Sequence, residues 1–333
     1  MRNFTDIVGQ DSIKEYFQNV IAQEKLSHAY VFQGEQRSGK EFISKIVAMT
    51  LQCSDRQEIE GMIQPCGNCP SCMQTMTMNQ PDIIYVTHEK KSIGVDDIRR
   101  QVNEDVYIKP YSSKYKIYMI ADADKMTQEA QNAILKTLEE PPSYAIIILL
   151  VANTEMLLDT ILSRCVMLRM QPVREDALRN YLLEVVQIPD YRVNLCIAFA
   201  RGNLGRAKQL AEKEDFEQMR QEVVRLLKHM KDMEVSELIQ AMEQMKEYNI
   251  EVSDYLDLIA IWYRDVLLFK ATNDMNHLIF KEEIQQIKSV ATTSDYAGLE
   301  YILDAIEIAK SRLRAKVKQE LAMELLLLTL REN

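Results

Sequence analysis

Hydrophobic residues in the first half of the chain occur in short uninterrupted runs, separated by longer stretches in which they recur at helical spacing. Apolar runs of about four to eight residues are typical of strands buried on both faces, and their alternation with helices indicates a parallel sheet. Five strands are expected, at residues 29–33, 82–86, 116–121, 145–152 and 166–169. The pattern therefore predicts a doubly wound α/β domain ending near residue 170.

A crossover helix is expected between the third and fourth strands. Thr127 has the side chain of an N-cap residue, and Pro141 with Pro142 would end the helix. The apolar positions between them recur at helical spacing, at Ala130, Ala133, Ile134 and Leu138. Such a helix would connect two parallel strands.

From about residue 172 the strand pattern stops and helical periodicity replaces it. Gly202 and Gly205 punctuate a small helical bundle ending near residue 212, and longer amphipathic helices follow to residue 330. We therefore expect an α/β domain, a small helical domain and an all-α C-terminal domain, at residues 1–170, 171–212 and 213–333.

Composition narrows the possible functions. With 47% apolar and 27% charged residues the chain of 333 residues is an ordinary globular protein, and 9 Gly and 8 Pro are too few for an all-β protein with many hairpins. The net charge of -10 argues against autonomous DNA binding, which needs a basic footprint. No signal peptide or membrane span is recognisable, so we expect a cytoplasmic protein with no membrane partner.

Four cysteines have the spacing of a metal site. Cys66, Cys69 and Cys72 form two overlapping C-x2-C steps, and Cys53 precedes them in a segment, 53–72, that we expect to be an insert. Four thiolates match tetrahedral zinc and leave no open position for water, so the sequence predicts one structural zinc ion per chain. The alternative is a set of buried cysteines without metal.

A glycine loop follows the first strand. It contains Gly34, Gly39 and Lys40 and opens a helix, which is the setting in which backbone amides and a lysine bind phosphate. Glu41 stands where a working loop has a Ser or Thr hydroxyl for Mg²⁺. We therefore expect a degenerate loop, and ATP binding is doubtful.

The end of the third strand supports the same interpretation. Nucleotide hydrolysis needs acidic residues there to hold the metal and to orient water. Ala121 occupies the expected place of the metal-holding Asp, and Asp122 occupies the place of a Glu. We predict that the chain does not hydrolyse ATP.

Several strings are specific in combination. Ser-His-Ala-Tyr at 27–30 before the glycine loop, Leu-Lys-Thr-Leu-Glu-Glu-Pro-Pro at 135–142 and Ser-Arg-Cys at 163–165 occur in this order. Together with the cysteine insert and the helical tail, they make the chain resemble the bacterial clamp-loader family of AAA+ proteins over nearly its whole length.

The resemblance implies a RecA-like (AAA+) domain carrying the zinc module, a helical lid and a helical collar. It implies a hetero-pentamer held together by the collars, which places the sliding clamp on primer-template DNA during chromosomal replication by DNA polymerase III. ATP binds between subunits in that family, so Arg164 is expected to act in trans as an arginine finger on a neighbour's nucleotide. Gly205 stands where active members have a nucleotide-sensing lid arginine.

Two other functions compete with this one. The chain could be an active AAA+ ATPase, the motor subunit of the same loader, and Glu41 and Ala121 argue against that. A zinc-containing P-loop kinase or repair ATPase would leave the strings at 135–142 and 163–165 unexplained, and it predicts a monomer or homo-oligomer.

Overall fold

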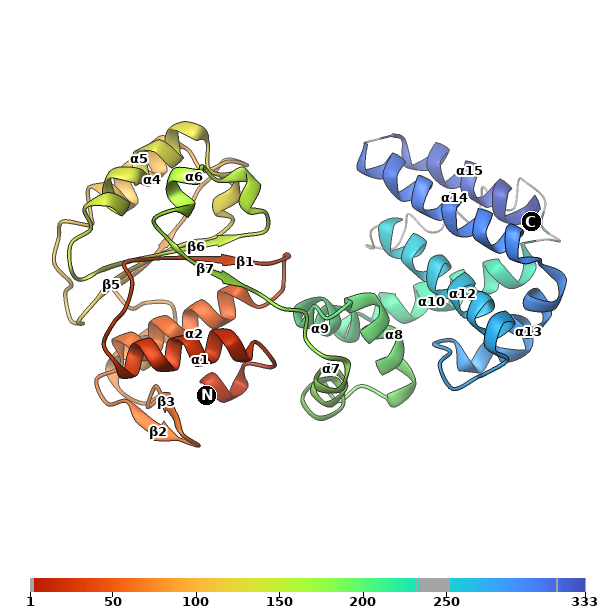
Figure 1. Ribbon diagram of the computed structural model, residues 1–333, viewed down its shortest axis with the longest axis horizontal. Helices are drawn as coiled ribbons and strands as arrows, with labels where there is room; N and C mark the ends of the chain where they lie inside the picture. The colour runs from red at the N-terminus through yellow and green to blue at the C-terminus, as the bar shows by residue number, and fades with distance from the viewer. Residues whose placement is uncertain (1–2, 231–232, 234–251, 316, 333) are drawn as a thin grey trace. The chain divides into compact units, whose positions relative to one another are not determined.

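The computed structural model describes residues 3–230, 233, 252–315 and 317–332 (Figure 1). The chain forms two compact units, of which the first comprises residues 1–178 and 202–206, and the second residues 179–201 and 207–333. The division into three domains at 170 and 212 stays a prediction. Within the described ranges, no helix has both the length and the hydrophobicity needed to cross a bilayer.

The first unit is built on a parallel sheet of five strands in the order β4-β5-β6-β1-β7. The strands are β1 (Ala29–Gln33), β4 (Ile83–Val86), β5 (Lys116–Ile120), β6 (Ala145–Val151) and β7 (Val166–Arg169). All seven residues of the central strand β6 are buried, as expected for a strand covered on both faces. The predicted parallel sheet and its five strands are confirmed.

Helices cover both faces of this sheet (Figure 1). Alternate strand residues divide between two cores: Tyr30 and Phe32 pack toward α1 and α2, whereas Ala29 and Val31 pack toward α5. The helices and helical turns of the unit up to β7 are η1 (Phe4–Asp6), α1 (Asp11–Ala22), α2 (Lys40–Gln52), α3 (Pro70–Met76), α4 (Val95–Ile98), η2 (Arg99–Asn103), η3 (Ala123–Lys125), α5 (Gln128–Glu139), η4 (Thr154–Met156) and α6 (Asp159–Leu162).

The expected crossover helix is α5. The side chain of Thr127 accepts a hydrogen bond from the Ala130 N–H at 3.2 Å, so the N-cap prediction is confirmed. The helix ends at Glu139, and Pro141 and Pro142 follow it. Its buried stripe consists of Ala130, Ile134 and Leu138.

A short hairpin was not predicted. Strands β2 (Gln57–Ile59) and β3 (Met62–Gln64) pair antiparallel within the cysteine insert. Each strand has only three residues, and β2 is exposed throughout, so it contains no apolar run that a hydrophobic pattern could reveal.

Every described element after β7 is a helix or a helical turn, which confirms the predicted change of pattern. These elements are α7 (Glu175–Asn180), η5 (Tyr181–Val186), α8 (Asp190–Ala200), α9 (Leu204–Glu212), α10 (Glu214–His229), α12 (Val252–Thr272), η6 (Lys281–Glu283), α13 (Ile284–Thr293), α14 (Tyr296–Arg314) and α15 (Gln319–Glu332). The part of the predicted helical tail at 231–232 and 234–251 lies outside the described residues.

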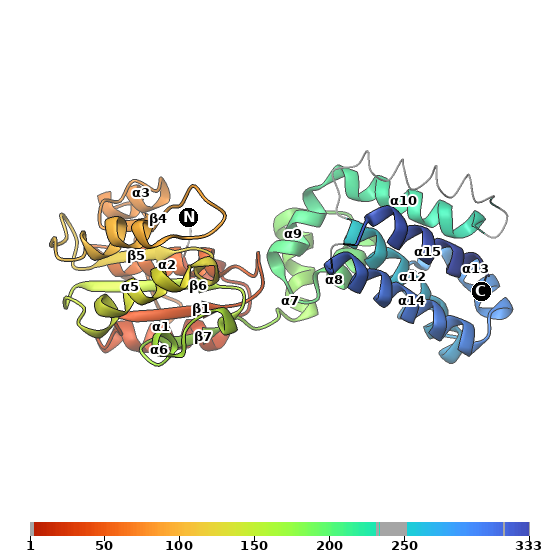
Figure 2. The same cartoon turned by 90° about the horizontal axis from the view of Figure 1, so that it is seen from above.

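The second unit is organised around α12, which packs against α10, α13 and α14, while α14 packs against α15 (Figures 1 and 2). Trp262 is buried in this core, with its ring centroid 5.4 Å from that of Phe280. The fully buried Asp265 carboxylate accepts the N–H groups of Ile279 and Phe280 at 2.7 and 2.8 Å. These bonds fix the loop before η6 against α12.

Candidate functional site

The four predicted metal ligands come from three neighbouring elements. Cys53 caps the C-terminus of α2, Cys66 follows β3, and Cys69 and Cys72 lie at the N-cap and in the first turn of α3. Their sulfur atoms all lie within 4.8 Å of one another. The structure thus brings together every cysteine that the spacing singled out.

The geometry fits a tetrahedral metal ion. The Cys53 sulfur lies 3.5 Å from that of Cys66 and 4.0 Å from that of Cys69. A tetrahedron with metal–sulfur bonds of about 2.3 Å has edges of about 3.8 Å, whereas a disulfide bond is about 2.0 Å long. The four thiols are free cysteines. The donor set and its spacing therefore suit a closed thiolate site.

Backbone amides prepare these sulfurs to carry negative charge. The N–H groups of Cys66, Cys69 and Cys72 donate to the sulfurs of Cys53, Cys66 and Cys69 at 3.3, 3.3 and 3.4 Å. Burial alone would raise the pKa of Cys69, but hydrogen bonds from Cys72 and Ser54 outweigh it and lower the pKa to about 6. Burial raises the pKa of Cys53 and Cys72, and a bound cation would offset that cost.

The glycine loop has the predicted setting, because β1 ends at Gln33 and α2 begins at Lys40. The lysine, however, is folded onto the loop itself. Its ammonium group donates to the carbonyl oxygens of Gly34 and Glu35, the latter at 2.7 Å. Burial lowers the pKa of Lys40, and the nearby carboxylates of Asp124 and Asp122 oppose part of that shift. Lys40 thus satisfies protein acceptors where a working loop would place phosphate.

A second segment lies on the same loop. The Gly205 N–H donates to the Arg37 carbonyl at 3.2 Å, and the Asn203 amide donates to the Gln36 carbonyl at 2.9 Å. A Cβ atom on Gly205 would lie 2.2 Å from the Arg37 oxygen, so only glycine allows this approach. Sequence reasoning singled out Gly205 as a missing arginine but did not find the packing that a residue without a side chain permits.

This packing predicts a large effect for Gly205→Ala. Alanine favours a helix by about 1 kcal/mol over glycine, but a contact this short with backbone forces the segment and the loop apart, which we expect to cost about 1–3 kcal/mol net. The thermal unfolding midpoint of the first unit should fall. Gly94→Ala is the control, since its Cβ would meet no atom closer than 3.6 Å. Equal stability of the two variants would contradict the prediction.

The acidic positions near the loop are arranged differently from those of a hydrolase. The Glu41 carboxylate pairs with Lys45, one turn along α2, at 2.6 Å. Asp122 pairs with Lys125 at 2.7 Å, and Ala121 at the end of β5 supplies no ligand. One oxygen of Asp124 is buried without a partner among the described residues.

Arg164 lies between α6 and β7. Its guanidinium pairs with the Glu139 carboxylate at 2.8 Å and donates to the Thr160 carbonyl at 2.8 Å. Strand β7 runs parallel to β1, with Tyr30 opposite Val166 and Gln33 opposite Arg169. The glycine loop follows the end of β1, whereas Arg164 precedes the start of β7. The glycine loop therefore lies at the C-terminal ends of the strands and Arg164 at their N-terminal ends. The four residues of β7, or about 13 Å, separate the two sites.

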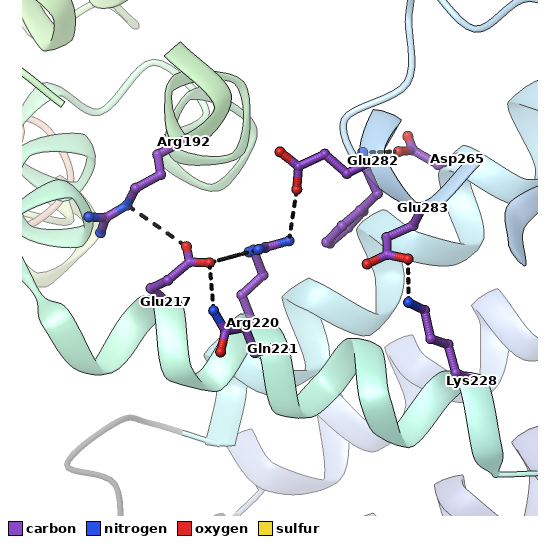
Figure 3. Close-up of polar contacts among 9 residues, drawn as sticks. Arg192, Glu217, Arg220, Gln221, Lys228, Asp265, Glu282 and Glu283 are labelled. Carbon is purple, nitrogen blue, oxygen red and sulfur yellow. Dashed lines mark hydrogen bonds and ion pairs between the residues drawn. The ribbon is translucent and has the colours of Figure 1, made fainter. Parts of the chain in front are cut away.

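A surface pocket of about 300 Å³ lies beside α10 in the second unit and is lined partly by cations. Arg220 pairs with Glu217 at 2.7 Å and with Glu282 at 3.7 Å, and Lys228 pairs with Glu283 (Figure 3). These carboxylates already neutralise Arg220 and Lys228, two of the three Arg and Lys residues in the lining. The network joins α10 to η6, and we assign it a structural role.

Family models match both ends of the chain. Residues 9–174 match the model described as "DNA polymerase III, delta subunit", and residues 214–332 match "DNA polymerase III, delta subunit, C terminal". The chain is 30% identical to DNA polymerase III subunit delta' of Bacillus subtilis over 327 residues, which is 97% of each protein. It is 26% identical to subunit tau of the same organism over 306 residues, or 86% of this chain and 53% of tau.

Solved structures with a similar course of the chain include two replication proteins. A DNA polymerase III gamma subunit-related protein from Thermotoga maritima is 19% identical and aligns over 97% of this chain and 98% of its own, with a TM-score of 0.40. The Bacillus subtilis DNA clamp loader delta protein is 11% identical over 96% of this chain and 99% of its own, with a TM-score of 0.34.

Proposed function

Because the chain belongs to the delta and delta' family of bacterial DNA polymerase III clamp-loader subunits, we propose that it is the loader subunit that assists hydrolysis without performing it. It assembles in the cytoplasm with other loader subunits into a hetero-pentamer, through the helical collar at 213–333. The complete loader opens the sliding clamp and places it on primed DNA, whereas this chain supplies Arg164 to a neighbour's ATP.

The position of Arg164 carries this proposal. Arg164 lies at the N-terminal ends of the strands, whereas the chain's own glycine loop lies at their C-terminal ends. Arg164 therefore cannot reach a nucleotide bound at that loop. Its side chain is one-third exposed, at 34%, and is accessible to a neighbouring chain. An arginine acting in trans needs both properties, because it must avoid its own site and reach another one.

The glycine loop supports the proposal that this chain does not itself hydrolyse ATP. Lys40 binds the carbonyls of Gly34 and Glu35, and the segment at 203–205 binds those of Gln36 and Arg37. A nucleotide would have to displace Lys40 from these acceptors. It would find neither the Ser or Thr hydroxyl of a working loop at position 41, where the Glu41 carboxylate pairs with Lys45, nor a carboxylate at Ala121 to hold Mg²⁺. The motor-subunit alternative requires all of these defects to be overcome.

We expect the isolated chain to hydrolyse no ATP and Lys40→Ala to leave the activity of the assembled loader within about twofold of wild type. The reason is that a loop without the Ser or Thr hydroxyl and the strand-end Asp that hold Mg²⁺ has no turnover for the lysine to support. Phosphate release by the isolated chain and by the reassembled loader measures both effects. Robust turnover by the isolated chain, abolished by Lys40→Ala, would establish the motor alternative. Binding of labelled ATP shows whether nucleotide binds without turnover.

We also propose that the four-cysteine cluster holds one zinc ion per chain as a structural element. Cys53, Cys66, Cys69 and Cys72 would bind it, and it would tie the C-terminus of α2 to the β2–β3 hairpin and to α3. With all four positions taken by thiolates, the ion would supply folding free energy and no catalytic water.

A further inference from the structure

The arginine assigned to a neighbour's nucleotide is held by its own chain. One Nη2–H of Arg164 meets the Glu139 carboxylate at 2.8 Å, and Nη1 donates to the Thr160 carbonyl at 2.8 Å and to the Ser163 hydroxyl at 3.3 Å. These acceptors come from the end of α5 and from α6 with the residue after it. The guanidinium is thus fixed between two elements that meet only in the folded unit.

The contacts leave part of the guanidinium available. The group has five N–H donors, and among the described residues the Nε–H of Arg164 has no acceptor. The side chain is still 34% exposed. A phosphoryl oxygen could therefore be bound by the free donors while Glu139 and Thr160 keep their own bonds.

We propose that Glu139 is a positioning residue for Arg164, which presents the guanidinium in a fixed orientation to the nucleotide of the neighbouring subunit. This inference rests on the proposed function of Arg164. Arginine has a long side chain with much rotational freedom, and that freedom is lost when the group engages a phosphate. An ion pair that restricts the side chain beforehand lowers this cost at the moment of reaction.

The Glu139–Arg164 ion pair is strong enough to orient the arginine but too weak to withhold it from a nucleotide. Exposed ion pairs shift an equilibrium by less than about fivefold, whereas an arginine finger contributes about 10³ to 10⁵ in rate. Glu139 is 51% exposed, so its hold on the arginine is of the weak class. It can select an orientation, but it cannot withhold Arg164 from a transferring phosphoryl group.

Single-turnover ATP hydrolysis by the reassembled loader tests the proposal. The kinetic phase that Arg164→Ala removes identifies the site served by this chain. Glu139→Ala should slow that phase about two- to fivefold, because the preorganisation lost cannot exceed the strength of the exposed ion pair that provides it. The ATP concentration at half-saturation should stay unchanged. Glu139→Gln keeps a neutral acceptor and should lie between Glu139→Ala and wild type.

A matched control and a double-mutant cycle separate positioning from general damage. Glu140→Ala changes the adjacent carboxylate, which pairs with no cation in the described part of the chain, and it should behave as wild type. In an Arg164→Ala background, Glu139→Ala should have no further effect on hydrolysis. If it slows hydrolysis there too, or has no effect beside a functional Arg164, or accelerates the phase, the positioning role is wrong. If Arg164→Ala itself removes no phase, the proposed function fails instead.

Discussion

Purified full-length protein is expected to contain one zinc ion per chain, and Cys69→Ser is expected to lower zinc affinity by more than about 100-fold. Loss of a partner outside the ligand set already costs about 10- to 100-fold, and Cys69 would itself be a ligand. It is also the N-cap of α3, where its sulfur accepts the Cys72 N–H. Metal analysis after dialysis against a weak chelator measures the loss.

The same variant should loosen the cysteine module, because zinc binding and folding of such a module are coupled. Limited proteolysis should then cleave within the segment 53–76, while the sheet remains intact. Cys196→Ala is the control, since this buried cysteine belongs to the second unit and lies outside the cluster. Wild-type protein without zinc, or a Cys69→Ser variant that keeps it, would refute the metal assignment.

The elements that could be predicted are those whose signals are local. Seven consecutive apolar residues predict strand β6. An N-cap at Thr127 and two prolines after the last turn predict α5. Hairpin β2–β3 has no such signal, since β2 is exposed and each strand is only three residues long. Its pairing depends on the insert folding as a whole.

The site residues, too, were predictable only where their signal lies within one short segment of the chain. The ligand spacing at Cys66, Cys69 and Cys72 lies within one short segment and could be recognised from the sequence. The pair between Glu139 and Arg164 could not, because it forms where α5 packs near α6, and nothing in either segment specifies that contact. The packing of Gly205 on Arg37 likewise joins segments that are far apart in the chain.

The expected action of Arg164 on a neighbour's nucleotide comes from the family resemblance, and the sheet adds a geometric reason for it. Without the resemblance, the residue types suggest only an arginine near a strand, which could serve its own chain or another one. The parallel pairing of β7 with β1 places the start of β7 at the end of the strands farther from the glycine loop. Action on a neighbour's nucleotide is therefore an inference from topology as well as from the Ser-Arg-Cys string.

Arg164→Ala is expected to remove the contribution of this chain to hydrolysis and to leave the protein folded. Removing an arginine finger costs about 10³ to 10⁵ in rate at a single site. A loader with several ATP sites should lose only the share carried by the site that Arg164 serves. Stability should change by less than about 1 kcal/mol, because Arg164 is partly exposed and its ion pair is a surface pair. Zinc content and assembly should be unchanged.

The measurements are DNA-stimulated ATP hydrolysis and clamp loading by the reassembled complex. Arg164→Lys should recover little activity, since a compact ammonium group cannot reproduce the planar fork that contacts Glu139 and Thr160 and that, in the proposed function, also binds a phosphoryl group. Arg174→Ala is the control, because Arg174 is also in a surface ion pair, with Asp176 at 2.9 Å, and has no proposed role in hydrolysis. If Arg164→Ala supports wild-type hydrolysis at every site of the loader, Arg164 is an ordinary surface residue and the chain contributes to assembly alone.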